Sequence, residues 1–539
     1  MHKDMKKILL ALATLGLGIC TVGCSRFLDG EKKLGSLDTD AYYANATDEE
    51  ALYLINNVYI QSRGAAPTTN TMSDELLYTG DAIYGGASTQ TASMTGNFGT
   101  LYQMNYKCNM IIAQLPEDSR EKTRVVGEAY FWRAWAYMHL IRGWGTPPLV
   151  DHLLTEEELQ PENGNPADLW NYVYTSLDEA IKRLPSRTSP DGQRALGARV
   201  TKETAEAIYG KSAVIAGDMA LARTHLANVI NSGLYGLIDN YRDLYTTKAD
   251  WCKEYLWEYN AEDDNYSFRD KETNYGTANV WRNVYVISPG GAHLAGDAEG
   301  RINTFVNGGF YQFLVDRGEK GKPRQLGNVW NLDDVIDMFE IYEGLSGHAA
   351  YSAFLRGYTT TGIDNCQGYF QAKEYMWYTD MYLTPDGKIT SSKDICSKVN
   401  RAGMRYAEVL LLYAEACLGS SDEAKGLAAL NQVRRRAGLD DLPAYKLKDV
   451  QDEKRAELFL EGGERFWDCI RWGIAAEAFA KVGDATYQLL VDDPEKDTFI
   501  VSRTPFGAYT GWQDKYKLIP FPYSEMNLNP NLKQNPGWD

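Results

Sequence analysis

Two pairs of helical patterns, each joined by a short turn, limit the folds open to this chain of 539 residues. In the first pair, residues 202–215 and 219–231 have helical periodicity and are linked through Gly217 and Asp218. The second pair covers residues 405–418 and 422–437. Two helices that cross at small residues are the unit of tetratricopeptide-like repeats, which are about 34 residues long. Because the spacing here is looser, we predict a scaffold of helical hairpins and not a regular solenoid.

Four earlier segments also show the three- and four-residue spacing of apolar side chains that is typical of helices. They are residues 48–59, 101–115, 125–141 and 168–184. The third, VVGEAYFWRAWAYMHLI, is apolar on nearly every face and is therefore predicted to be a buried helix. The predicted fold class is mostly α.

The pattern changes in the middle of the chain. Residues 245–400 are rich in Gly, Asn, Tyr and Asp and have few long apolar periods. We therefore predict a loop-rich, variable part of the kind that often carries function. It separates an N-terminal helical part (24–244) from a C-terminal helical scaffold with a turn-rich tail (401–539), which ends in LIPFPYSEMNLNPNLKQNPGWD.

The N-terminus has the features of a bacterial lipoprotein signal. A basic start precedes the apolar run of residues 8–20, which is too short to span a bilayer comfortably. TVGC then places small residues before Cys24, which resembles a lipobox, although Thr21 stands where Leu is usual. We predict that residues 1–23 are a signal peptide and that lipidated Cys24 anchors the protein to a membrane. An ordinary secretory signal with an incidental cysteine is the alternative.

Charge and cysteine usage exclude some classes of function. The net charge of -18 argues against a nucleic-acid partner, which would need Lys and Arg to displace counterions. Six cysteines follow Cys24 and none forms a CxxC pair, so the sequence has no zinc or redox motif and suggests no cofactor. A disulfide between Cys366 and Cys396 stays open. Buried free thiols are expected in apolar helical patterns, at Cys108, Cys417 and Cys469.

Several segments, in order along the chain, resemble the SusD/RagB family of surface lipoproteins of Bacteroidetes. The resemblance begins with CSRFLD at Cys24 and continues through AYYANATDEEALYLINNVY, LYQMNYKCNMII and GARVTKETAEAIYGKSAVIAGDMALA. It resumes in RYAEVLLLYAEA, ALNQVRRRAGL, RAELFLEGGERFWDCIRWG and LIPFPYSEMNLNPNLKQNPGW. The loop-rich middle matches poorly.

This resemblance implies a SusD-like fold on a tetratricopeptide-like scaffold. It also implies a non-catalytic protein that holds a glycan and passes it to a SusC-like, TonB-dependent transporter of the outer membrane. Cys24 would tether the protein there, facing the cell exterior. A RagB-like protein of the same family that takes peptides is the alternative.

A glycan site needs aromatic faces for the C–H groups of sugars and polar side chains for their hydroxyls. Two stretches combine them, SDELLYTGDAIYGG (residues 73–86) and NYGTANVWRNVY (residues 274–285). The resemblance implies ligand loops at about these positions, as regions only, and core packing stays the alternative for each ring. The candidate ligand residues are Asp74, Tyr78, Asp81, Tyr84, Tyr275, Trp281, Arg282, Asn283 and Tyr285, with Trp330, Tyr358, Tyr375 and Trp377 as weaker candidates.

Two other functions compete with a nutrient binder. A scaffold that binds only protein fits the helical hairpins. A glycosidase-like enzyme would need two carboxylates, for which Asp333-Asp334 or Asp263-Asp264 are available. Adjacent acids on a loop are more often turn formers or calcium ligands than a catalytic pair.

Carboxylates and arginines also gather in RAELFLEGGERFWD, residues 455–468. Glu457, Glu461 and Arg465 are spaced by four, so we expect them on one helix face, in a structural ion-pair network. Arginine beside each Glu would lower its pKa, which opposes a role as general acid. His139, on an apolar helix, is expected to be a core residue and not a ligand for metal.

Overall fold

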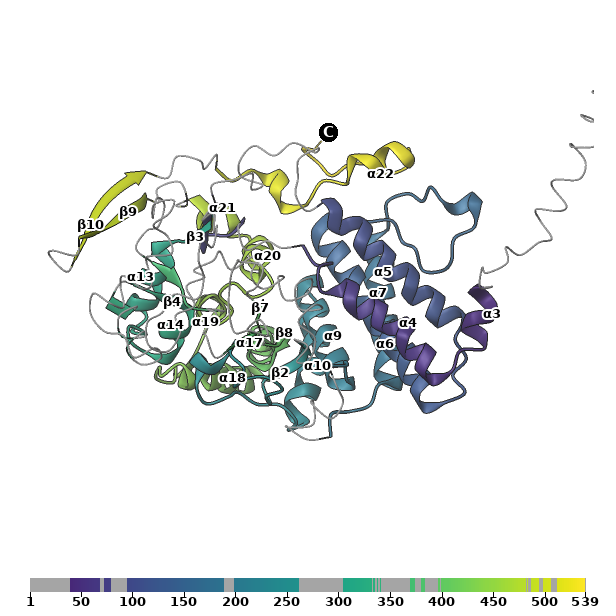
Figure 1. The fold of residues 1–539 in the computed structure, drawn as a ribbon, viewed down its shortest axis with the longest axis horizontal. Coiled ribbons are helices and arrows are strands. Elements are labelled where there is room, and N and C mark those ends of the chain that lie inside the picture. Colours follow the sequence, from purple (N-terminus) through teal and green to yellow (C-terminus); the bar gives the residue numbers. More distant parts are fainter. Residues whose placement is uncertain are drawn as a thin grey trace, which may run out of the picture.

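The fold is that of a computed structural model of the chain, which is mostly helical, as predicted (Figure 1). The structure describes residues 39–67, 72–78, 95–188, 198–260, 304–331, 369–373, 380–382, 396–397, 399–480, 486–493, 498–505 and 511–538, with single positions at 333, 334, 337, 340 and 482.

The N-terminal part is a bundle of helices. Its members are α3 (Thr39–Ala44), α4 (Asp48–Ser62), α5 (Thr95–Gln114), α6 (Arg120–Trp144) and α7 (Pro166–Arg183). The central helix is α6, which packs against α4, α5 and α7 (Figure 1). Nearly every side chain of α6 from Val125 onward is buried, which confirms the predicted buried helix and extends it to Trp144.

Local sequence signals set where these helices begin. Thr47 accepts a hydrogen bond from the backbone of Glu50, and the Glu50 carboxylate accepts one from the backbone N–H of Thr47, which is a capping box. Ser119 caps α6 with one hydrogen bond, which its hydroxyl accepts from the backbone N–H of Lys122. Asn165 caps α7, and Pro166 occupies the first turn, where its missing N–H costs nothing.

Two stacked hairpins form the predicted scaffold. The first consists of α9 (Lys202–Ala216) and α10 (Met219–Asn231), and the second of α17 (Tyr406–Cys417) and α18 (Glu423–Arg436). Gly217 makes the first turn with φ 88°, a left-handed conformation that glycine adopts without strain. Because α10 also packs against α17, hairpins far apart in the sequence form one layer.

The described strands pair only as antiparallel two-stranded ribbons. These ribbons are β1 (Leu76–Tyr78) with β3 (Thr304–Val306), β2 (Tyr255–Tyr259) with β8 (Arg401–Arg405), β4 (Val329–Trp330) with β5 (Phe370–Gln371), β6 (Met381–Tyr382) with β7 (Cys396–Ser397), and β9 (Thr486–Asp493) with β10 (Thr498–Pro505). The β2–β8 ribbon joins the chain after the first hairpin to the start of α17, with Tyr255 opposite Arg405 and Trp257 opposite Met404.

Shorter helices complete the structure. They are η3 (Glu156–Glu158), η4 (Tyr241–Asp243), α13 (Gly308–Asp316), α14 (Pro323–Asn328), α19 (Leu447–Glu457), α20 (Glu464–Arg471), α21 (Ala475–Ala480), η8 (Asp514–Lys517) and α22 (Tyr523–Leu528). The C-terminal tail returns to the N-terminal bundle (Figure 1, yellow). There the indole of Trp144 donates to the Pro520 carbonyl at 3.0 Å, and the Ile519 N–H donates to the Gly143 carbonyl at 2.7 Å.

One local prediction is wrong. Glu457, Glu461 and Arg465 do not share a helix face, because α19 ends at Glu457 and α20 begins at Glu464. Between them Leu460, Gly462 and Gly463 have φ values of 61°, 58° and 69°. Two consecutive glycines make this left-handed turn accessible and break the helix that the spacing predicted.

The buried thiols are as predicted. Cys108, Cys417 and Cys469 are buried and free, and burial raises the pKa of Cys108 to about 12, so it stays an unreactive thiol. Cys366 lies outside the described residues, so its pairing with Cys396 stays untested. The division of the chain into three parts also stays a prediction.

The crossing of α9 and α10 yields a stability test. A Cβ added at Gly210 would lie 2.4 Å from Cγ of Leu226 on α10. We expect Gly210→Ala to lower the free energy of unfolding by about 1–3 kcal/mol through overpacking. Gly99→Ala in α5 is the matched control, because its new Cβ meets nothing within 4 Å and should add up to about 1 kcal/mol of helix propensity. Urea denaturation of both variants measures the difference, and a Gly210→Ala protein as stable as Gly99→Ala would contradict this crossing.

Candidate functional site

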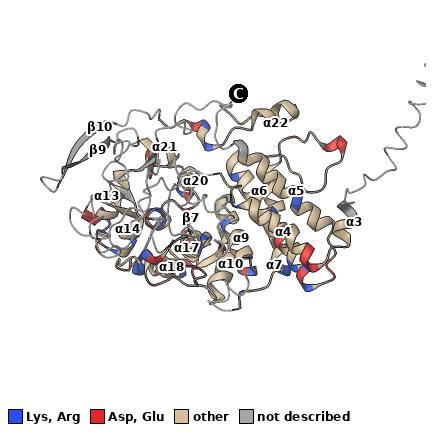
Figure 2. Ribbon diagram, in the orientation of Figure 1, with Lys and Arg blue, Asp and Glu red and all other residues tan. Residues whose placement is uncertain are grey.

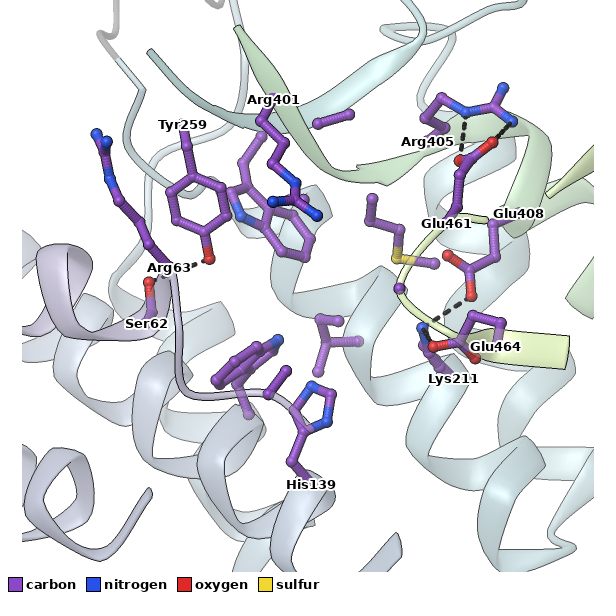
Figure 3. Close-up of a pocket in the computed structure, with 18 of the residues that line it drawn as sticks. Ser62, Arg63, His139, Lys211, Tyr259, Arg401, Arg405, Glu408, Glu461 and Glu464 are labelled. Atoms are coloured by element: carbon purple, nitrogen blue, oxygen red, sulfur yellow. Dashed lines mark hydrogen bonds and ion pairs between the residues drawn. The ribbon is translucent and has the colours of Figure 1, made fainter. Parts of the chain in front are cut away.

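A pocket of about 130 Å³ lies where the N-terminal helices meet the β2–β8 ribbon and α17 (Figure 3). The chain from the end of α4 to Pro67 lines it, together with α6, α9, the β2–β8 ribbon, α17 and the 460–464 turn. Its lining combines indole and phenol rings with charged side chains. This lining fits a small ligand that has both apolar and hydrogen-bonding groups.

Opposite charges meet on the floor of the pocket. The ammonium of Lys211 lies 2.8 Å from Glu408 Oε1 and 2.9 Å from Glu464 Oε1. Arg142 also pairs with Glu464, at 2.8 Å. Burial alone would raise the pKa of Glu464, but Arg142 and Lys211 hold it well below its usual range. Glu464 is therefore a fixed anion.

The imidazole of His139 points from α6 into this pocket (Figure 3). It stacks edge-on against Trp135, with ring centroids 4.2 Å apart, and its Nδ1 lies 3.1 Å from a guanidinium nitrogen of Arg142. A guanidinium only donates, so Nδ1 accepts and the proton of the neutral ring is assigned to Nε2. Burial, followed by the charges of Arg142 and Lys211, lowers the pKa of His139 well below its usual value. The predicted core position is confirmed, and the ring is also part of a site.

Aromatic rings form the opposite wall. Tyr259 Oη and Ser62 Oγ are 3.1 Å apart, and the Arg63 guanidinium lies 5.7 Å from the centroid of the Tyr259 ring. The indole of Trp257 lies over Gly403, where a Cβ would be 1.9 Å from Trp257 Cε2. Glycine at 403 is what allows the indole to lie against β8.

Behind the pocket, the expected ion-pair network is present. Glu461 accepts hydrogen bonds from Arg405 at 2.6 and 2.7 Å and from Lys373 at 2.5 Å. Glu457 lies between Arg436, Arg405 at 3.0 Å and Arg324 at 3.3 Å. Burial alone would raise the pKa of Glu457, but these arginines lower it to about 2. Figure 2 shows both signs of charge gathered around α14, α17 and α18.

Of the sequence-predicted ligand residues, only two fall in the described structure. Asp74 is buried, and its carboxylate accepts from Arg465 at 2.9 and 3.1 Å and pairs with Arg455 at 2.9 Å. Its surroundings are those of a structural ion pair. Tyr78 is the last residue of β1. Asp81, Tyr84, Tyr275, Trp281, Arg282, Asn283 and Tyr285 lie outside the described residues, so their ligand role stays a prediction.

The weaker candidates divide in the same way. Trp330 is 1% exposed and donates to the Leu326 carbonyl at 2.7 Å, so it is a packing residue. Asp334 accepts from the Asn331 backbone at 3.0 Å, as a turn former does. Tyr358, Tyr375, Trp377 and Asp263-Asp264 lie outside the described residues.

Sequence reasoning missed most of the pocket. Lys211, Glu408 and Trp257 come from three separate elements and have no common motif. A signal existed in GKSAVIAG and RYAEVLLLYAEA, where a charged residue interrupts a helix that is otherwise small or apolar. Such a residue is buried only with a partner.

Two family models match this chain. The model described as the SusD family matches residues 356–538, and the one described as "Starch-binding associating with outer membrane" matches residues 25–211. The chain belongs to the SusD/RagB family. A SusD-like protein of Bacteroides ovatus is 24% identical over an alignment of 498 positions, and the match covers 83% of this chain and 81% of the relative.

Solved structures show the same SusD-like fold. A laminarin-binding SusD-like protein has a TM-score of 0.66 and 22% identity over 91% of this chain and 99% of its own. Surface glycan-binding protein A from Bacteroides thetaiotaomicron, in complex with laminarihexaose, has the same TM-score and identity over 91% of this chain and 100% of its own. Among the described residues, no helix is long and apolar enough to cross a membrane.

The ion-pair network predicts a pH-dependent stability. The pKa of Glu457 is lower in the folded than in the unfolded chain, so its contribution is present above the unfolded pKa of about 4.5 and is lost as the pH falls toward about 2. We expect Glu457→Gln to cost about 3–5 kcal/mol of unfolding free energy at neutral pH, because it leaves buried arginines under-compensated. The cost should shrink as the pH approaches 2.

Urea denaturation at several pH values measures this cost. The control is Glu157→Gln on exposed η3, which should change stability by less than about 0.5 kcal/mol at any pH. A cost of Glu457→Gln that is the same at acid and neutral pH would contradict the assigned network.

Proposed function

We propose that this protein is a non-catalytic surface lipoprotein that captures a glycan and passes it to a SusC-like, TonB-dependent transporter of the outer membrane. The observation that carries the proposal is family membership together with a fold that matches laminarin and laminarihexaose binders over 91% of the chain. The family model's own description supports association with the outer membrane.

The chemistry of the pocket supports binding over hydrolysis. A glycosidase of the usual kind needs one carboxyl group that stays protonated as general acid. The pKa values of Glu461 and Glu464 are instead lowered by fixed cations, although burial alone would raise them. Both carboxylates are therefore held ionised.

Glycan capture is tested by affinity electrophoresis of the purified protein against a panel of polysaccharides, with laminarin first. We expect retardation by one class of glycan, reduced about five- to tenfold in affinity by Trp281→Ala or Tyr84→Ala, as for buried aromatic contacts in other interfaces. Tyr106→Ala is the matched control, because Tyr106 is 57% exposed on α5.

The outcomes separate function from site. Retardation that survives both substitutions would keep glycan binding and reject these two residues. No retardation by any polysaccharide, with calorimetric binding of peptides, would replace the proposal with the RagB-like alternative.

Anchoring is tested separately through Cys24. We expect Cys24→Ala to abolish incorporation of labelled fatty acid and to move the protein out of the membrane fraction, because stable anchoring depends on the acyl chains. Cys108→Ala, at a buried thiol, should leave labelling unchanged. A Cys24→Ala protein that is still labelled would contradict the assigned lipidation.

A further inference from the structure

The pocket has a deep, closed end. Tyr259 and Arg401 at its rim are half-buried, and Gly403 and Gly462 are exposed. The residues of the floor are all less than 10% exposed: Trp135, Met138, His139, Ile208, Lys211 and Glu408. A cavity of about 150 Å³ holds one benzene molecule in an engineered protein, so 130 Å³ is the scale of a single six-membered ring.

The floor presents a neutral donor. Since Nδ1 of His139 accepts from Arg142, Nε2 carries the hydrogen, and no partner for Nε2 occurs among the residues that the structure describes. Burial, followed by the charges of Arg142 and Lys211, lowers the pKa of His139 and keeps the ring neutral, against the opposite effect of Glu464. The donor therefore keeps its hydrogen, and the ring stays uncharged, across the neutral range.

The floor also presents an acceptor. Oε1 of Glu408 lies 2.8 Å from the Lys211 ammonium, and neither carboxylate oxygen of Glu408 accepts a hydrogen bond from the described residues, so Oε2 is left for a ligand. Glu408 is on α17 and His139 on α6, and both line the same pocket (Figure 3). A ligand at the floor thus meets one donor and one acceptor in a pocket that the rings of Trp135 and Trp257 also line.

We propose that this pocket takes the terminal ring of a neutral glycan end-on, with sugar hydroxyls bound by His139 Nε2 and the free oxygen of Glu408. This inference rests on the proposed function and names the part of the glycan that is recognised. A hydroxyl fits because it donates and accepts at once. The aromatic walls suit the C–H faces of the ring.

Charge selects a neutral ligand. An anionic group at the floor would approach Glu408 and Glu464, and a cationic group would approach Lys211 and Arg142. Each would disturb an ion pair that is already compensated, whereas a hydroxyl uses the remaining oxygen of Glu408 without adding charge. The floor therefore favours an uncharged sugar end over a uronic acid or an amino group.

Calorimetry with laminarihexaose as the probe tests the residues. We expect Glu408→Gln to weaken binding about five- to tenfold, because its amide oxygen still accepts a hydrogen bond but no longer carries the charge that strengthens it. His139→Gln keeps a donor and should weaken binding less than His139→Ala. Affinity of the unaltered protein should not change from about pH 8 to about pH 6.5, since the pKa of His139 lies well below its usual value of 6.5. The controls are Glu157→Gln and His152→Gln, both at exposed positions outside the pocket.

A further variant tests the pocket without altering the buried charges of its floor. Ala66 is half-buried and lines the pocket, so Ala66→Trp should block entry while the floor stays intact. Each variant is used only if its thermal unfolding shows a folded protein. Laminarin fractions of different chain length test the end-on geometry. The amount of protein that a fraction binds should follow its number of chain ends and not its mass.

The failures are distinguishable. Laminarihexaose binding that is unchanged in folded Glu408→Gln, His139→Ala and Ala66→Trp overturns the pocket and leaves the proposed function standing. Binding of laminarin in proportion to mass overturns end-on recognition. If laminarihexaose does not bind in calorimetry but another neutral glycan retards the protein, the same variants are tested with an oligosaccharide of that glycan. Unchanged binding of that oligosaccharide to all the variants overturns the pocket. Absence of binding to every glycan overturns both proposals.

Discussion

The carboxylate of Glu457 holds together elements that the chain order keeps apart. It pairs with Arg324 of α14, Arg405 of β8 and Arg436 of α18. Glu254, just before β2, adds a second anion to Arg405 at 2.5 Å and to Arg436 at 3.1 Å. An unpaired buried charge costs about 3–5 kcal/mol, so no one of these elements is free to shift alone. We interpret the network as fixing one arrangement of the C-terminal half, and less as a source of net stability, because replacing such pairs with apolar groups is often neutral.

The pocket depends on that arrangement. Arg405 holds Glu461 in the left-handed turn between α19 and α20, and this turn forms one wall. Most of the floor comes from α6 and α9 of the N-terminal half. Lys211 is the last residue of the first matched region, and its partners Glu408 and Glu464 lie in the second. The two halves that the family models match separately thus meet through these ion pairs, and neither half contains the pocket alone.

Sequence alone predicted what is set locally. The helices of both hairpins follow from periodicity, and the starts of several helices follow from capping residues such as Thr47 and Ser119, which act within a few residues. The ion-pair role of Glu457 and Glu461 was predicted from neighbouring arginines. The prediction that they share one helix face was wrong, because the Gly462-Gly463 turn ends the helix. The partners of Glu457 were out of reach, because Arg324 is 133 residues away in the chain. His139 was correctly placed in the core, yet its pocket required Glu408 from a distant helix.

Most polar groups of the site pair with one another, and only a few are left to bind a ligand, which is compatible with the proposed binding of a sugar. The buried charges are used against one another, and lowered pKa values keep Glu457, Glu461 and Glu464 ionised beside their cations. What is left for a ligand is modest: a neutral imidazole N–H, one carboxylate oxygen and aromatic faces. Such groups replace the hydrogen bonds that a hydroxyl makes to water without a large gain, so affinity per sugar is expected to be low and exchange fast. The proposed release of a glycan to a transporter needs that balance, and a proton donor able to cleave the chain would work against it.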